Sequence, residues 1–230
     1  MAGAGAGRVG SGSVPTTAAP LPVTPPPFAT ARLDALPLEP AYAEEMAAIL
    51  ADPVLYDFTG GEPPSRDALR VRYERQCAGS PEPGERWWNW VLRVRTAGEG
   101  PAEGAGGVAG EVTGRADGEP DDRSDADSAG QPAGRLVGYV QATVRGPRAE
   151  IAWVIGTPWQ GRGYAREAAR GLAAHLASAG GVRELVAHIH PDHAASAGVA
   201  VAAGLGPTGE WEDGERRWAG NVPPPPMPQQ

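Results

Sequence analysis

Hydrophobic positions recur along the chain with two periods, and each period predicts a different kind of element. Alternating apolar residues across 31–38 predict a strand. A four-residue spacing at Leu69, Tyr73 and Cys77, behind the favourable N-cap Ser65, predicts a helix. The order of these segments predicts an α/β fold. Further strands are expected at 87–95, 136–144, 149–156, 184–189 and 210–218 (the last a strand or a hairpin), and further helices at 40–52, 165–179 and 194–203.

Three stretches show neither period, and we expect them to be disordered. Residues 1–28 are almost entirely small residues and proline, 97–134 contain no aromatic residue, and 221–230 include four consecutive prolines. Such segments cannot bury enough apolar surface to offset the entropy of ordering them. One domain is therefore expected at 29–220, with the segment 97–134 inserted at the tip of a hairpin.

Charge and cysteine content narrow the classes of partner. The net charge is −8, but the insertion alone holds nine acidic and two basic residues, so the rest of the chain is nearly neutral and offers no electrostatic case for nucleic acid. No apolar run approaches the roughly 18 residues of a membrane span. The one cysteine, Cys77, fits a reducing compartment. We expect a cytoplasmic monomer or homodimer without nucleic-acid or membrane partners.

Candidate chemistry concentrates at one glycine-rich junction, Gln160-Gly161-Arg162-Gly163-Tyr164-Ala165, between a predicted strand and a predicted helix. Glycine lets the backbone turn tightly and approach a ligand closely. The first amides of a helix have no partner within it, and the helix dipole adds partial positive charge there. The junction is therefore a candidate seat for a phosphate or diphosphate. A plain turn without a ligand explains the same residues.

Two well-known phosphate loops do not fit this junction. A dinucleotide fingerprint starting at Gly161 would need a third glycine at position 166, which is Arg166. A Walker loop needs a lysine, and all twenty basic residues of the chain are arginine. Arg162 and Arg166 flank the turn, either as partners of phosphate or as solvent-exposed helix charges.

Three segments together resemble the GNAT superfamily of N-acetyltransferases. Ile151–Gly156 followed by the glycine turn resembles its acetyl-CoA motif. The stretch from His190 to Leu205 is similar to the segment after the family's fifth strand, where an Asn commonly occupies the place of His193. Leu55–Pro63 looks like the opening phrase of the subgroup similar to ribosomal-protein-alanine N-acetyltransferases. The resemblance covers about residues 29–218.

The resemblance implies a mixed, strongly twisted sheet of six to seven strands flanked by about four helices. The family's fourth strand would splay from the fifth, and the pantetheine arm of acetyl-CoA would pair with backbone around Val154 and Ile155. The turn Gln160–Ala165 would hold the pyrophosphate, and His193 and Ser196 would face the coenzyme near its thiol. The implied reaction is acetyl transfer to a primary amine, of a protein N-terminus or a small molecule, in a ternary complex without a metal.

Direct attack by an amine on a thioester needs a neutral amine and a protonated leaving thiolate. Glu150 resembles by position the carboxylate that some GNAT enzymes use as a base through a water, although a solvated strand-end acid is the simpler interpretation. Ser196 is a candidate proton donor or a helix first-turn hydroxyl. Many relatives have a tyrosine four residues beyond this serine, and here that position is Ala200.

Two other functions stay open at this point. A non-catalytic acyl-CoA-binding or sensory domain would keep the glycine turn but would need neither Glu150 nor Ser196. A zinc-dependent hydrolase would use His188, His190 and His193, of which the first two point the same way from a strand. No fourth ligand of matching spacing accompanies them.

Overall fold

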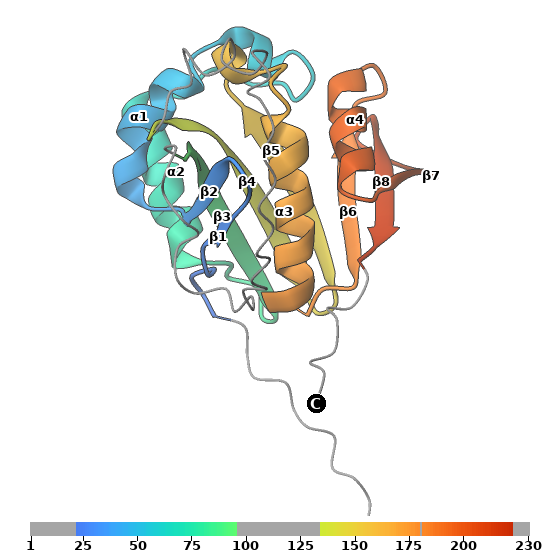
Figure 1. Cartoon of the computed structure of the whole chain (residues 1–230). Coiled ribbons are helices and arrows are strands. Elements are labelled where there is room, and N and C mark those ends of the chain that lie inside the picture. The colour runs from blue at the N-terminus through green and yellow to red at the C-terminus, as the bar shows by residue number, and fades with distance from the viewer. Residues whose placement is uncertain (1–21, 96–133, 180, 223–230) are drawn as a thin grey trace, which may run out of the picture.

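The computed structural model describes residues 22–95, 134–179 and 181–222, and within them eight strands form one sheet (Figure 1). The strand order is β1-β2-β3-β4-β5-β6-β8-β7, and every neighbouring pair is antiparallel except β5 and β6, which are parallel. The strands are β1 (Phe28–Ala29), β2 (Leu33–Pro37), β3 (Glu85–Val94), β4 (Leu136–Arg145), β5 (Arg148–Ile155), β6 (Glu184–Ile189), β7 (Gly206–Glu212) and β8 (Glu215–Asn221).

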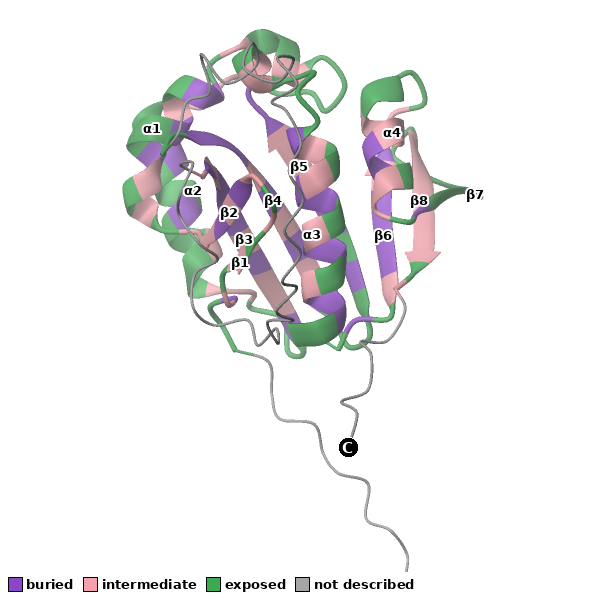
Figure 2. Ribbon diagram, viewed as in Figure 1, coloured by how far each residue is buried: buried purple, intermediate pink, exposed green. Residues whose placement is uncertain are grey.

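Four α-helices cover the two faces of the sheet. The helices α3 (Tyr164–Ala179) and α4 (Ala194–Ala202) pack on one face, and α1 (Ala43–Ile49) and α2 (Arg66–Ala78) pack on the other. The alternation of strand residues supplies apolar side chains to both layers, so one core lies on each face. Buried residues gather in the central strands, and exposure rises toward the β7 edge (Figure 2). The expected mixed α/β sheet with about four helices is confirmed.

The element boundaries differ from expectation in two places. The sheet has eight strands rather than six or seven, because a two-residue strand, β1, precedes the expected first strand and the last segment is a full hairpin. The expected helix at 40–52 divides into the 3-10 turns η1 (Pro40–Tyr42) and η2 (Pro53–Tyr56) with α1 between them. Pro53 has no N–H to donate and therefore starts a new turn instead of extending α1.

The N-terminal tail expected over 1–28 is wrong for its last residues. The indole N–H groups of the fully buried Trp88 and Trp90 donate to the carbonyls of Pro22 (3.0 Å) and Pro26 (2.9 Å), so residues 22–28 lie against the sheet. A proline-rich segment has no hydrophobic period to reveal it, but its carbonyls satisfy buried donors. The rest of that tail, residues 1–21, lies outside the described residues.

The other two expected boundaries are affected less. The amide of Val222 donates to the carbonyl of Arg183 at 2.8 Å, so the chain stays on the sheet two residues past the expected end of the domain at residue 220. Residues 223–230 and 96–133 lie outside the described part. The strands that flank the acidic insertion do form a hairpin, since the amide of Gly134 donates to the carbonyl of Val94 at 2.8 Å. Among the described helices, none has the length and apolar character needed to cross a membrane.

Candidate active site

The parallel strands β5 and β6 pair only at their beginnings. Their register contains three residue pairs and ends at Glu150 opposite Val186. Beyond this point the two strands diverge, whereas β5 remains paired with β4 up to Ile155 (Figure 1). Within the described chain, the edge of β5 from Ile151 to Ile155 therefore has no neighbouring strand on the β6 side. The splay expected between these strands is present, and Val154 and Ile155 lie in its unpaired part.

The glycine turn lies at the open end of this splay. Gly161 and Gly163 have φ angles of +75° and +80°, a region that other residues enter only with strain. The carbonyl of Gly163 accepts the amide of Glu167 at 3.1 Å, so α3 begins directly at the turn. The first amides of α3 have no partner inside the helix and carry the positive end of its dipole. The unpaired strand edge is thus followed by the 3-10 turn η3 (Thr157–Trp159), and then by the glycine turn and these amides.

Two side chains hold the turn in place. Gln160 Nε2 donates to the carbonyl of Ile155 at 2.9 Å and ties the turn to the end of β5. Arg32, which sequence reasoning missed, donates from Nη1 to the carbonyl of Arg162 at 3.1 Å and from Nε to Glu167 Oε2 at 2.7 Å. The sequence carries no local signal for this contact, because Arg32 and Arg162 are 130 residues apart.

Glu167 holds the Arg32 side chain in place beside the turn. Its Oε1 also accepts Thr30 Oγ1 at 2.6 Å and the backbone amide of Arg32 at 2.7 Å. Partial burial disfavours the charge of Glu167, but these hydrogen bonds and the Arg32 guanidinium outweigh it and hold the pKa of the carboxyl below its usual value. Glu167 is therefore ionised at neutral pH and fixes Arg32 against the turn.

The residues expected near the thiol end lie across the splay from β5. His193 is the N-cap residue of α4, and its ring stacks on Phe58 at 4.3 Å between centroids. Burial, and then the neighbouring His190, lower the pKa of His193, so the ring is neutral at neutral pH. Ser196 lies in the first turn of α4. Ala200, at the place of the family's tyrosine, is fully buried in the core.

Glu150 and His188 meet where the two strands part. Glu150 Oε1 lies 3.2 Å from His188 Nδ1, and Glu212 Oε2 lies 3.2 Å from His188 Nε2. The Glu150 side chain is half exposed, so its carboxylate has access to a bound substrate and to water. A carboxylate at the closed end of the splay is well placed to accept a proton there.

The three histidines of the zinc alternative are not brought together as a ligand set. His188 faces two carboxylates, His193 stacks on Phe58, and the ring of His190 lies 5.4 Å from the same phenyl ring. Among the described residues, no three His, Cys, Asp or Glu side chains form a group that could hold a metal ion.

A small cavity with a mixed polar and apolar lining lies between α2 and the sheet, on the same face as Glu150. It has a volume of about 60 Å³, and its polar lining includes Arg72, Gln76, Asn89 and Gln141. Gln141 pairs with Ala152 of β5, so the cavity lies one strand away from the splay. The lining residue Tyr73 is only 5% exposed, and its hydroxyl has no hydrogen-bond partner among the described residues. Burial raises the pKa of this phenol.

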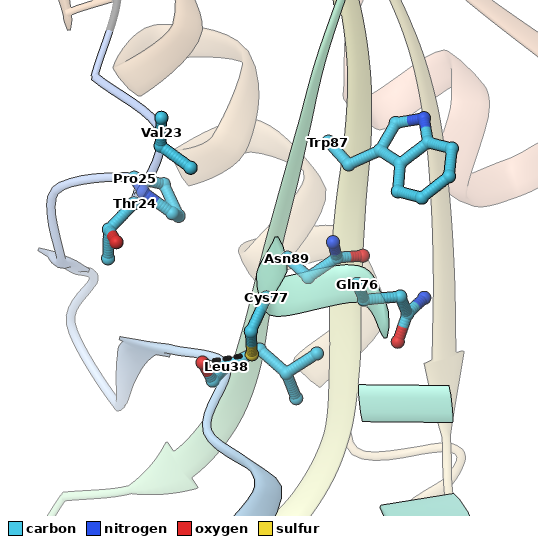
Figure 3. Close-up of a pocket in the computed structure, with 8 residues that line it drawn as sticks. All are labelled: Val23, Thr24, Pro25, Leu38, Gln76, Cys77, Trp87 and Asn89. Carbon is cyan, nitrogen blue, oxygen red and sulfur yellow. Dashed lines mark hydrogen bonds between the residues drawn. The ribbon is translucent and has the colours of Figure 1, made fainter. Parts of the chain in front are cut away.

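A second cavity of about 30 Å³ adjoins the same helix (Figure 3). Gln76 and Asn89 line both cavities, and the N-terminal residues 23–25 form the opposite wall. The Cys77 thiol donates to the carbonyl of Leu38 at 3.1 Å, and partial burial raises its pKa. Cys77 is therefore held as a thiol that supports the junction of α2 with β2, and it contributes no nucleophile to the splay.

The splay, the glycine turn and the helix start together define an α/β protein that can hold a phosphate-bearing coenzyme against an open strand edge. Comparison with known families identifies the family of this protein. The acetyltransferase (GNAT) domain model matches residues 32–206, more than half of the 230-residue sequence. The chain therefore belongs to the GNAT acetyltransferase family, and the enzyme class predicted from its sequence is confirmed.

Solved structures share the fold at low sequence identity. RimL, a ribosomal L7/L12 alpha-N-protein acetyltransferase in complex with coenzyme A, has a TM-score of 0.59 and 12% identity over 86% of this chain and 98% of its own. A GNAT-family acetyltransferase from Bacillus anthracis has a TM-score of 0.57 and 14% identity over 84% of this chain and 96% of its own. Spermidine N-acetyltransferase from Vibrio cholerae, in complex with CoA and spermine, has a TM-score of 0.55 and 14% identity over 83% of this chain and 95% of its own. No curated protein matches the chain in sequence.

Proposed function

We propose that this protein transfers the acetyl group of acetyl-CoA to a primary amine by direct attack in a ternary complex. The observation that carries the proposal is the unpaired edge of β5 from Ile151 to Ile155, which leads through η3 to the turn at Gly161 and Gly163. An extended pantetheine chain fits the hydrogen-bonding edge of a strand, and a diphosphate fits the first amides of α3. The turn Gln160–Ala165, with Arg162, is the pyrophosphate seat in this assignment.

The chemistry uses residues at both ends of the splay. An ammonium acceptor, with a pKa of about 10.4 for an alkylamine and about 8 for an α-amine, first loses a proton to Glu150, directly or through a water. The amine nitrogen then bonds to the thioester carbon, and a backbone amide near Val154 or Ile155 stabilises the developing oxyanion. The C–S bond breaks, the thiolate takes a proton from the Ser196 hydroxyl or from a water on that side of the splay, and the nitrogen gives up its second proton to the oxygen that supplied this one, which leaves the neutral amide and the free thiol.

The acceptor reaches the thioester from the face that carries Glu150. Ala152 is small and exposed, so it leaves the path open between the α2 cavity and the splay. Arg72 and the amides of Gln76, Asn89 and Gln141 offer hydrogen-bond donors there, and no carboxylate lines the cavity. This lining suits an acceptor with carbonyl or carboxylate oxygens near its amine, such as a protein N-terminus or a small amino compound, better than a polycationic amine.

We assign the reaction to the cytoplasm. The support is Cys77, the one cysteine of the sequence, which allows no intrachain disulfide and suits a reducing compartment. Fractionation of cells that express the chain, followed by detection with an antibody, is the direct check.

The test combines coenzyme binding with a screen of acceptors. Purified protein is given acetyl-CoA with peptides that have free N-termini, amino-acid amides and polyamines, and released thiol and acetylated product are measured. We expect thiol release that depends on the acceptor, with peptides or amino compounds above polyamines. Tight coenzyme binding without release from any acceptor would instead indicate a non-catalytic acyl-CoA-binding domain and would overturn the proposal.

A further inference from the structure

Arg32 contacts three groups at the glycine turn and the start of α3. Its guanidinium donates from Nε to Glu167 and from Nη1 to the carbonyl of Arg162. The same group lies over the ring of Tyr164, with Cζ 4.8 Å from the ring centroid. Contacts on two edges and one face fix the plane of a guanidinium, which is otherwise a mobile group on a long side chain.

The third nitrogen of this guanidinium faces the turn. A Cβ built on Gly163 would lie 3.4 Å from Arg32 Nη2, so this nitrogen is in contact range of the turn's backbone. Among the described residues, Nη2 donates to no acceptor. The Arg32 side chain is 41% exposed, and a ligand at the turn can reach it. Two N–H groups are thus left over at the place where the first amides of α3 are also unpaired.

The local charge favours an anion at this place. Glu167 neutralises one positive charge, but Arg162 and Arg166 also flank the turn, so the group as a whole stays positive. Arg166 is directed toward α4, where a Cβ on Gly198 would lie 2.9 Å from its Nη2. Arg32 is therefore the arginine that the structure directs at Gly163.

We propose that Arg32 is a coenzyme-binding residue that donates from Nη2 to the diphosphate of the coenzyme and positions the turn through the carbonyl of Arg162. The inference rests on the proposed function for the identity of the ligand, and it deepens that function by naming a residue of the N-terminal segment as part of the site. Glu167 and Thr30 act through Arg32 and are positioning residues.

The test compares CoA with pantetheine, which has the same thiol arm but lacks the diphosphate and the 3′-phosphoadenosine attached to it. Replacing Arg32 by Met removes the guanidinium and keeps the length of the stem, and we expect a rise of about 10-fold in the Kd of CoA in calorimetry, the size of one hydrogen bond to a charged group. The affinity for pantetheine, measured by competition, is expected to stay within about twofold of the wild type.

Two further variants control for charge and for folding. Arg70→Met removes an exposed arginine of α2 that pairs with Glu74, and it should leave both ligands unaffected. Arg32→Lys keeps the charge but lacks the planar fork that holds Glu167 and the turn together, so an intermediate loss of CoA affinity is expected. This variant takes the place of Arg32→Met if the Met variant does not fold.

The possible outcomes separate this inference from the proposed function. Unchanged CoA affinity in Arg32→Met, or an equal loss for CoA and pantetheine, overturns the role of Arg32 while the transferase assignment stands. A selective loss of CoA affinity in a protein that acetylates no amine supports Arg32 and removes the transferase assignment. A wild-type protein that binds neither ligand removes both.

Discussion

The two sides of the splay are built by different means. The proposed coenzyme side is mostly main chain, namely the unpaired edge of β5, two glycines with positive φ and the start of α3, and Arg32 is the side chain proposed to join it. The proposed acceptor side draws on side chains from distant segments, with Glu150 from β5, His188 from β6 and Phe58 from the loop after η2. The coenzyme half of the proposed site therefore depends chiefly on backbone conformation, and the acceptor half depends on side-chain identity. Substitutions should therefore affect coenzyme affinity on one side and turnover or acceptor use on the other.

The substitution with the largest expected effect changes turnover and leaves coenzyme affinity unchanged. Replacing Glu150 by Gln removes the proposed base, and we expect kcat to fall by about 10²- to 10⁴-fold. The deficit should narrow as the pH approaches the pKa of the amine, because less proton removal is then needed. The Kd of CoA should not change. Steady-state rates across pH check this, with the exposed Glu74→Gln as the control, and a kcat within twofold of the wild type would rule Glu150 out as the base.

The substitution with the next largest expected effect lowers coenzyme affinity. Proline at position 163 removes an amide and cannot adopt the φ of +80° found there, so the Kd of CoA should rise by about 10- to 100-fold. Gly84 has the same φ of +80° and open space around it, which makes Gly84→Pro the matched control for backbone strain. Calorimetry on both variants is the measurement. Equal affinities would show that the turn does not hold the coenzyme.

A smaller effect is expected from the aromatic contact between Phe58 and His193. Phe58 stacks on His193, and such an aromatic pair contributes about 0.5–1.5 kcal/mol. Phe58→Leu should raise the KM of the acceptor by about 2- to 10-fold and leave the Kd of CoA within twofold. Val54→Ala, at another exposed apolar residue near this loop, should change neither. A shift in coenzyme affinity alone would place Phe58 on the coenzyme side.

The smallest effect concerns the pH dependence of stability on the coenzyme side. The pKa of Glu167 lies below its usual value, so the stabilisation from its carboxylate is complete above the unfolded pKa of about 4.3 and is lost as the pH falls through the folded value. Glu167→Gln should lower the Tm by about 2–4 °C at neutral pH, as expected for a loss of about 1 kcal/mol, and the difference should vanish in acid. Thermal melts across pH are the measurement, and a difference in Tm between the wild type and Glu167→Gln that stays constant with pH would contradict this prediction.

The same contrast explains what could be predicted from the sequence. Gly161 and Gly163 were identifiable because only glycine enters their φ region without strain, so a backbone requirement left a mark on residue type. The splay followed from the family resemblance and is present. The assignment of roles to Glu150 and Ser196 remains a prediction, although Glu150 is located where the strands part.

Contacts between distant segments could not be predicted. The contact of Arg32 with the turn and the stack of Phe58 on His193 join elements whose spacing along the chain carries no period. Composition predicts a disordered tail for the segment 22–28, because prolines bury little apolar surface, yet the segment supplies two carbonyl acceptors to the buried indoles of Trp88 and Trp90. Hydrogen-bond accounting of this kind requires the neighbour in space to be known.

Those two indole contacts bear on how far the chain can be trimmed from its N-terminal side. A chain shortened to begin at residue 29 would leave two buried N–H groups without acceptors, at about 1–3 kcal/mol each, whereas one that begins at residue 22 would keep both. Thr30 and Arg32 follow the same segment directly, so loosening its anchorage would also release the hold on the start of α3. Proteolytic nicking between residues 22 and 29 would then act on coenzyme affinity from a distance.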